Sequence, residues 1–224
     1  MDTLSFSVRR PLMLGAFVLA SATLLQGCFP LVAVGIGAGA VMVADRRTSG
    51  SYVDDEAIEW KVADTVSKHF GSLNHINVTS YNRNVLLTGE VQNESTRTEM
   101  QRLAWSVANV RSVVNELVVG PPSSLGARSN DALTTSNVKT RFLNSGQFSF
   151  NHIKVVTEAG AVFLLGIVTH AEGNQAAEIA RTSRGVTRVV KVFEYIGENA
   201  AKKLDNANSN RSNEPAPSPL SEAP

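Results

Sequence analysis

Two segments of the chain are near copies of each other, and this repeat limits the folds that the chain can adopt. Residues 74–91 read NHINVTSYNRNVLLTGEV and residues 151–168 read NHIKVVTEAGAVFLLGIV, and they align without a gap. Each copy has two runs rich in β-branched residues on either side of turn-forming residues, a pattern that predicts a β-hairpin. The chain is therefore expected to contain the same small unit twice.

The residues around each hairpin indicate the same order of elements: helix, strand, strand, helix, strand. Apolar residues four apart predict the first helix, with one buried stripe. In the first unit the positions are Ile58, Val62 and Val66, then strands 76–81 and 85–91, then Met100, Leu103, Ala104 and Val107, then strand 113–119. In the second unit they are Val138 and Phe142, strands 153–157 and 162–168, Ile179 and Ala180, and strand 189–196.

The composition along the chain predicts six segments. These are a signal peptide at 1–27, a Gly/Ala-rich segment at 28–53, the first unit at 54–119, a Pro- and Ser-containing linker at 120–129, the second unit at 130–197, and a disordered tail at 198–224. Because the linker is short and polar, the two units are expected to fold separately.

The beginning of the chain has the pattern of an export signal. Two arginines precede an apolar stretch, and Leu25-Gln26-Gly27-Cys28 resembles the lipobox of bacterial lipoproteins, which implies cleavage before Cys28 and lipidation, including palmitate, on it. The alternative is an unmodified cysteine in a membrane-spanning signal anchor, because the apolar run resumes from residue 31 to 44. By the same resemblance, Phe29 rather than Asp after the cysteine implies the outer membrane.

The ordered repetition resembles the BON domain family. The hairpin motif Val-x-Leu-x-Gly-x-Val falls at residues 85–91 and 162–168, and the family's Gly-Val before the last strand is Gly185-Val186 in the second unit but Asn109-Val110 in the first. The resemblance implies an α+β fold: two tandem αββαβ domains, each a three-stranded mixed sheet with two helices on one face. A lipobox followed by two such domains resembles dual-BON outer-membrane lipoproteins.

The sequence shows no constellation that predicts catalysis, a cofactor or a metal site. His75 and His152 occupy equivalent repeat positions, but no carboxylate or second histidine lies near either at ligand spacing, so both are interpreted as residues entering a strand. The acids at 54–56 and 59 are typical of a charged helix start. No enzyme is expected, and the near-zero net charge argues against nucleic-acid binding.

The two units differ in the sign of their charge. Residues 54–119 contain nine acids and six bases, whereas residues 130–197 contain five acids and seven bases. A basic unit near a membrane is attracted to anionic headgroups by about 1 kcal/mol per well-placed cation. Random divergence of the two surfaces explains the difference equally well.

One leucine of the second unit lies outside its helical stripe. Leu133 precedes Phe142 by nine residues, which at about 100° per residue places it on the opposite face of the helix. Together with Lys139 and Arg141, it is a candidate phospholipid-binding site, and in dual-BON lipoproteins the first helix of the second domain contacts phospholipid. The alternative is a leucine that packs against the linker at the start of the helix.

These observations predict a lipid-anchored outer-membrane lipoprotein that faces the periplasm, binds anionic phospholipid through its second BON domain and maintains envelope integrity. The alternative is a protein-interaction adaptor for outer-membrane assembly or cell-division machinery.

Overall fold

A computed structural model of the chain describes residues 45–70 and 75–212. The predicted signal peptide, Cys28 and the residues after 212 lie outside the described part. The elements of the first unit are α3 (Ser49–Phe70), β1 (His75–Tyr81), β2 (Asn84–Val91), α4 (Glu94–Ser106) and β3 (Ser112–Val119). Those of the second are α5 (Leu125–Ser145), the 3-10 turn η3 (Phe150–His152), β4 (Ile153–Glu158), β5 (Ala161–Val168), α6 (His170–Arg181) and β6 (Arg188–Tyr195).

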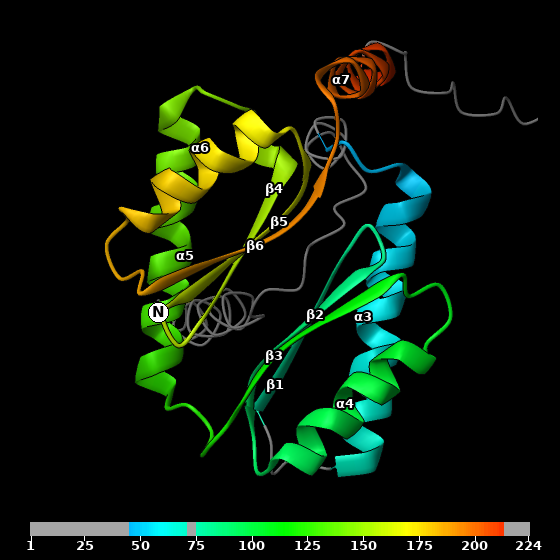
Figure 1. Cartoon of the computed structure of the whole chain (residues 1–224), viewed down its shortest axis with the longest axis vertical. Coiled ribbons are helices and arrows are strands. Elements are labelled where there is room, and N and C mark those ends of the chain that lie inside the picture. The colour runs from blue at the N-terminus through cyan, green and yellow to red at the C-terminus, as the bar shows by residue number, and fades with distance from the viewer. Residues whose placement is uncertain (1–44, 71–74, 213–224) are drawn as a thin grey trace, which may run out of the picture. The chain divides into compact units, whose positions relative to one another are not determined.

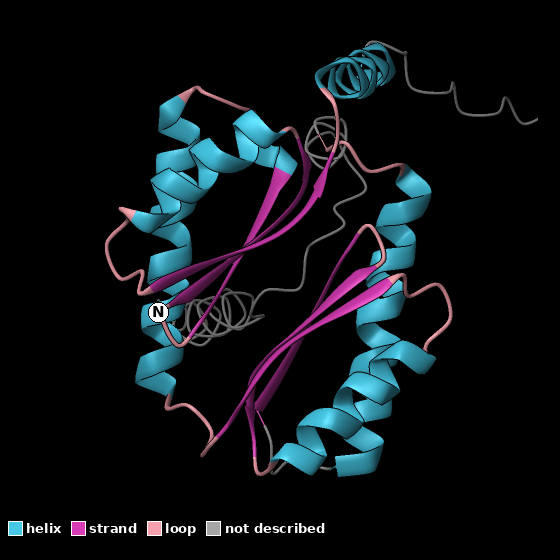
Figure 2. Cartoon of the chain, viewed as in Figure 1, coloured by secondary structure: helices cyan, strands magenta, loops and turns pink. Residues whose placement is uncertain are grey.

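Each unit is a three-stranded mixed sheet with its two helices on one face (Figures 1 and 2). The strand orders are β1-β2-β3 and β4-β5-β6, with an antiparallel hairpin followed by a parallel third strand in both. The predicted α+β class, the order of elements along the chain, the mixed three-stranded sheets and the helix placement are confirmed. Helix α3 begins five residues before the predicted start of the first unit, and α5 begins inside the predicted linker.

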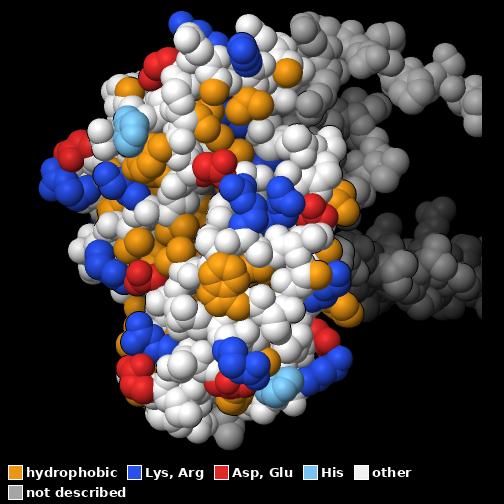
Figure 3. All heavy atoms as spheres, turned by 45° about the vertical axis from the view of Figure 1, so that its right-hand side comes forward, with side chains coloured by type: hydrophobic (Ala, Val, Ile, Leu, Met, Phe, Trp, Pro, Cys, Tyr) orange, Lys and Arg blue, Asp and Glu red, His pale blue; other side chains and the backbone are white. Residues whose placement is uncertain are grey.

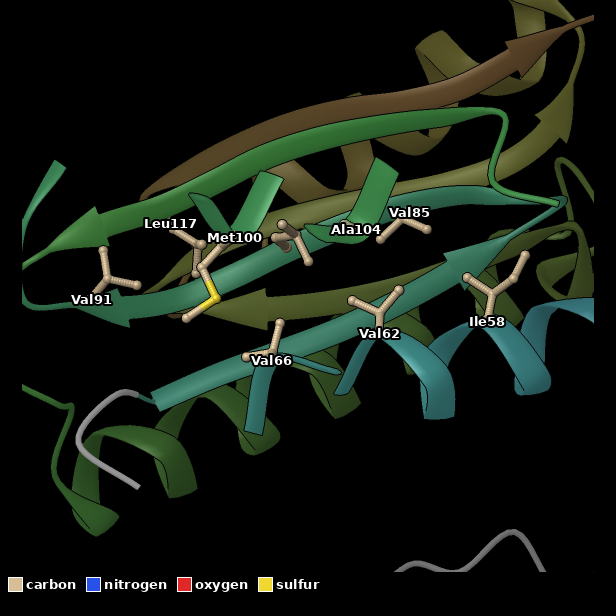
Figure 4. Close-up of a cluster of buried hydrophobic side chains, with 9 residues drawn as sticks. Ile58, Val62, Val66, Val85, Val91, Met100, Ala104 and Leu117 are labelled. Carbon is tan, nitrogen blue, oxygen red and sulfur yellow. The ribbon is translucent and has the colours of Figure 1, made fainter. Parts of the chain in front are cut away.

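The predicted helical stripes form the two cores between helices and sheets. In the first unit, Ile58, Val62 and Val66 point from α3 toward the sheet, where they meet side chains such as Val85 and Met100 (Figure 4). In the second unit, Val138 and Phe142 are buried against β4, β5 and α6. Burial of such side chains contributes roughly 1.5–3 kcal/mol each, so these stripes orient both first helices.

The glycine shared by the two hairpins is required by a close approach of the backbone. A Cβ atom on Gly89 would lie 2.0 Å from the carbonyl oxygen of His75, and one on Gly166 would lie 2.5 Å from that of His152. Either side chain would force the two strands of the hairpin apart. The same glycine therefore appears in both copies because the carbonyl oxygen of the equivalent histidine lies where a Cβ atom would be.

The sheet faces that carry no helices share a third apolar cluster, which we call the shared cluster. It contains Tyr81 and Leu86 of the first unit, and Ala161, Phe163, Leu165 and Ile167 of the second. Several polar contacts join the units as well, including the ion pairs Lys154–Glu59 at 2.8 Å and Arg188–Glu116 at 2.9 Å. The two units therefore pack against each other, because each sheet buries its second face against residues of the other unit. Whether each unit also folds alone, as expected from the linker, stays a prediction.

Residues before and after the two units also belong to the folded body. Helix α7 (Glu198–Ser212) follows the last strand, so the predicted disorder is wrong for residues 198–212. Ala201 is buried, and Asn208 donates a hydrogen bond to the carbonyl oxygen of Asp45 at 2.7 Å. This helix has few apolar residues and is held largely by polar contacts, which an apolar periodicity does not reveal.

Candidate functional site

Helix α5 presents the predicted lipid-binding side chains, and its local sequence fixes its ends. The hydroxyl of Ser124 accepts a hydrogen bond from the Ala127 amide at 3.2 Å, and Gly146 ends the helix with a left-handed backbone (φ 61°). The buried stripe directs the opposite face outward. Leu133 accordingly lies on the surface with 63% of its area exposed.

Two further leucines lie on the exposed surface of α5. Leu125 is 80% exposed and Leu143 is 59% exposed. They are eighteen residues apart, which is five turns at 3.6 residues per turn, so they project in the same direction, about 80° from Leu133. The sequence reasoning missed both, because it assigned Leu125 to the linker and considered only one position outside the stripe.

The charged residues of α5 are basic wherever they are exposed. Its single acid, Asp131, is buried, whereas Lys139 and Arg141 are exposed. Lys139 has no ion-pair partner among the residues that the structure describes. Leucines and basic side chains without acids on one helix face are typical of helices that rest on an anionic membrane surface.

Arg141 has a structural contact in addition to its exposure. Its Nη1 atom donates hydrogen bonds to the carbonyl oxygen of Ile179 and to the hydroxyl of Ser183, both at 2.8 Å. These contacts hold the guanidinium against the end of α6. Of the two predicted cations, Lys139 is therefore the one that is free to meet a headgroup.

A groove of about 600 Å³ lies beside Leu133, between α5, the β4–β5 turn and the loop after α6. Arg184 from that loop lines it, as do the amides of Asn130 and Asn137. Arg184 is exposed and has no ion-pair partner in the described part of the chain. Asp131 also lines the groove, although its carboxylate accepts hydrogen bonds from two backbone amides. The groove thus places a guanidinium, two amides and a leucine around a space that is large enough for a phosphate group.

The basic residues of the second unit include two kinds, those that pair with acids of the first unit and those that have no ion-pair partner in the ranges that the structure describes. Two bases of the second unit pair with acids of the first, as the ion pairs across the shared cluster show. Lys139 and Arg184 remain without such partners among the described residues. On the face seen in Figure 3, basic and acidic side chains are interspersed with hydrophobic ones, so that face shows no broad area of one charge.

Two aspartates at equivalent positions hold the hairpin turns from the first helices. Asp131 accepts hydrogen bonds from the amides of Ala159 at 2.9 Å and Gly160 at 2.8 Å. Asp55 accepts from the amides of Asn82 at 2.8 Å and Arg83 at 2.7 Å. Each turn has two successive positive φ angles, which leaves the two amides pointing to the carboxylate. Asp55 is thus a buried clamp and not part of a charged helix start.

The segment before α3 is anchored by two buried arginines. Arg46 donates to both oxygens of Glu172 at 2.7 and 2.9 Å and to both oxygens of Asp205 at 2.8 and 2.9 Å. Arg47 pairs with Asp45 at 2.6 Å and with Asp55 at 2.8 Å. The first unit, the second unit and α7 therefore all hold this segment. From sequence it was expected only to be part of the Gly/Ala-rich segment at 28–53.

His152 is buried beside this arginine network. Burial, followed by the nearby Arg46 guanidinium, holds the pKa of the imidazole below its ordinary value of 6.5. Its Nδ1 atom has no hydrogen-bond partner, although it lies 3.7 Å from Glu172. Burial raises the pKa of the Glu172 carboxyl, but the hydrogen bonds from Arg46 and from the Thr169 amide, together with the positive charge of Arg46, outweigh this and hold that pKa below its ordinary range. The site therefore favours a neutral histidine.

Within the described residues, no helix has the length and apolar character needed to cross a membrane. Cys28 lies outside these residues, so its expected lipidation stays a prediction.

Comparisons with known proteins match both units. Residues 54–121 and 130–197 each match the BON domain family. The outer membrane lipoprotein DolP of Haemophilus influenzae is 40% identical over 191 residues, which cover 83% of this chain and 97% of that protein. A 21 kDa hemolysin of Actinobacillus pleuropneumoniae is 36% identical over 68% of this chain and 79% of its own length. Osmotically-inducible protein Y of Escherichia coli is 30% identical over 68% of this chain and 78% of its own. With two matched domains and these relatives, the chain belongs to the BON domain family as a dual-domain, DolP-like member.

Proposed function

We propose that the chain is an outer-membrane lipoprotein, anchored through Cys28 and facing the periplasm, that binds anionic phospholipid through α5. The surface of α5 is the observation that carries this proposal: three exposed leucines, exposed bases and no exposed acid. The name of the DolP relative, an outer membrane lipoprotein, supports the proposed location at the outer membrane. The role is one of binding, without catalysis, and its consequence in the cell is the maintenance of envelope integrity.

The proposed contact has an apolar part and a charged part. Leu125, Leu133 and Leu143 insert shallowly among the acyl chains, and Lys139 remains at the level of the headgroups. Arg184 in the groove beside Leu133 binds the phosphate of one lipid. Lys139 contributes about 1 kcal/mol, or roughly fivefold in affinity, and its contribution weakens as salt screens the surface.

The test is co-sedimentation of residues 45–224 with vesicles of phosphatidylglycerol or of phosphatidylcholine. Leu133→Asp should lose most binding to phosphatidylglycerol vesicles, because it places a charge in the apolar contact. The melting temperature should barely change, since exposed substitutions usually stay within about ±0.5 kcal/mol. The matched control is Ala57→Asp, which alters the equivalent position of α3 and should bind as the wild type does.

Lys139→Glu tests the charged part of the contact. Binding to phosphatidylglycerol should fall at least about fivefold at low salt, with a smaller difference at high salt. Arg141→Glu is a poorer test, because it also breaks the contacts of Arg141 with α6. Wild-type binding by both Leu133→Asp and Lys139→Glu would place the lipid site elsewhere, or remove it.

Two exposed tryptophans favour a second candidate function, that of an adaptor for outer-membrane assembly or division proteins. Trp60 on α3 is 70% exposed and Trp105 on α4 is 48% exposed, and both belong to the first unit. Tryptophan is enriched among the residues that dominate protein–protein affinity. When cells are treated with a crosslinker, the Trp60→Ala variant should no longer be crosslinked to partner proteins. Its binding to vesicles should be unchanged.

A further inference from the structure

A cluster of three possible metal ligands lies where the two units meet. His75 begins β1, Glu90 lies directly opposite it on β2, and Glu158 comes from the end of β4 in the second unit. One ligand atom from each residue lies within 4.8 Å of the others. Nε2 of His75 is 3.8 Å from Oε1 of Glu158. Strand pairing brings two of these residues together, and the contact between units supplies the third.

The two carboxylates are arranged so that each keeps one oxygen available. Oε2 of Glu158 accepts hydrogen bonds from Nδ2 of Asn77 at 2.6 Å and from the hydroxyl of Thr88 at 3.4 Å. Oε2 of Glu90 accepts from the amide of Ser123 at 3.0 Å. Such outer contacts orient metal-ligating carboxylates. The remaining Oε1 atoms receive no hydrogen bond from the described residues.

The charges at this position are not balanced by a basic side chain. Glu158 is buried, with 7% of its area exposed. Among the described residues, neither Glu90 nor Glu158 has a lysine or arginine within 4.0 Å. Burial of a carboxylate without a compensating charge is costly. A bound cation would supply that charge.

The second repeat shows that the fold itself does not need this pair of side chains. By the alignment of the two hairpins, His152 is the counterpart of His75, and Ile167 is the counterpart of Glu90. His152 and Ile167 lie beside the arginine network and in the shared cluster, respectively. The histidine–glutamate pair is therefore specific to the first unit, at the end of the strands that approaches Glu158.

We propose that His75, Glu90 and Glu158 bind one Zn²⁺ ion, which joins the two units. One imidazole and two carboxylates form a ligand set that suits zinc, with water at the fourth position, whereas Ca²⁺ prefers six to eight oxygens. Zinc–ligand distances of about 2.0–2.2 Å place ligand atoms no more than roughly 4 Å apart. Binding would bring the three atoms from within 4.8 Å of one another to that separation, and would replace the 3.4 Å contact between Nε2 of His75 and Nδ2 of Asn77.

The test uses the full chain in detergent, stripped of metal with EDTA and desalted. Zinc content after re-addition should approach one ion per chain. Zinc at about a hundred times its dissociation constant should raise the melting temperature by roughly 5–10 °C, whereas Mg²⁺ should not. Absence of stoichiometric zinc, or of any thermal shift, would overturn the proposal.

Glu158→Gln and His75→Gln should each abolish the zinc-dependent rise in melting temperature. Glu158→Gln can keep the hydrogen bond with Asn77 while removing the buried charge, so without metal it should melt at or above the wild-type temperature. If one of these variants fails to fold, Glu90→Gln replaces it and should likewise abolish the zinc-dependent rise in melting temperature. His170→Gln, at an exposed histidine stacked on Tyr195, is the matched control and should keep the full rise. Zinc binding by Glu158→Gln equal to that of the wild type would also contradict the site.

Discussion

Helices α3 and α5 occupy the same place in the two units, yet their outer surfaces are opposites. Both bury residues at matched positions, Asp55, Ile58, Val62 and Val66 in α3 and Asp131, Thr134, Val138 and Phe142 in α5. Outside these positions, α3 has four acids and two bases, whereas α5 has three bases and no acid. The fold thus constrains the inner stripe of each helix, and the outer surface is left to carry what distinguishes the copies.

The largest effect is expected when one unit is removed altogether. Residues 129–197 alone would expose Phe163, Leu165 and Ile167, which the shared cluster buries. Each such side chain contributes roughly 1.5–3 kcal/mol on burial, so the fragment should be less stable than residues 45–212 by several kcal/mol. Circular dichroism melting of the two fragments measures the difference. Equal melting temperatures would show that the units do not depend on each other.

A smaller effect is expected when either of the aspartates that hold the hairpin turns, Asp55 or Asp131, is replaced, and its size should differ between the two. Asp55→Ala should lower the free energy of unfolding by roughly 3–5 kcal/mol, because Arg47, the Ser80 hydroxyl and two turn amides each lose a buried partner. Asp131→Ala should cost about 1–3 kcal/mol, since only two amides lose their acceptor. Urea denaturation of both variants tests this order. An equal loss in both would mean that the contacts of Asp55 with Arg47 and Ser80 contribute nothing.

The smallest effect concerns the histidine of the second hairpin. Because the pKa of His152 is lowered in the folded chain, the unfolded chain takes up a proton first as the pH falls. The stabilisation is therefore fully present above about pH 6.5 and is lost as the pH falls below that value. His152→Gln should flatten the change in stability between pH 7 and 5.5. The same slope in wild type and variant would exclude His152 as its source.

The sequence predicted the parts of the molecule that depend on apolar periodicity and turn residues. The stripes of Val62 and Val138 are buried as expected, and the Asn82–Arg83 turn has the positive φ angles that its asparagine favours. The ordered structure of residues 45–48 and of α7 was not predicted, because these segments are held by polar side chains that are distant in sequence, such as Arg46 and Asp205. The association of Glu158 with His75 escaped for the same reason: it depends on how the two units meet.

The buried arginines also fix the length of the segment that connects the folded domains to the proposed lipid anchor. Arg46 is eighteen residues after Cys28, a stretch that reaches at most about 60 Å when fully extended. With the proposed lipid on Cys28, Arg46 can never leave that radius around its anchor, and α5 can lie beyond it only by the distance that separates α5 from Arg46 within the folded body. Short tethers of this kind give local concentrations in the millimolar range. An α5 surface with only millimolar affinity would then still spend much of its time on the bilayer, and a detached fragment would underestimate its occupancy in the cell.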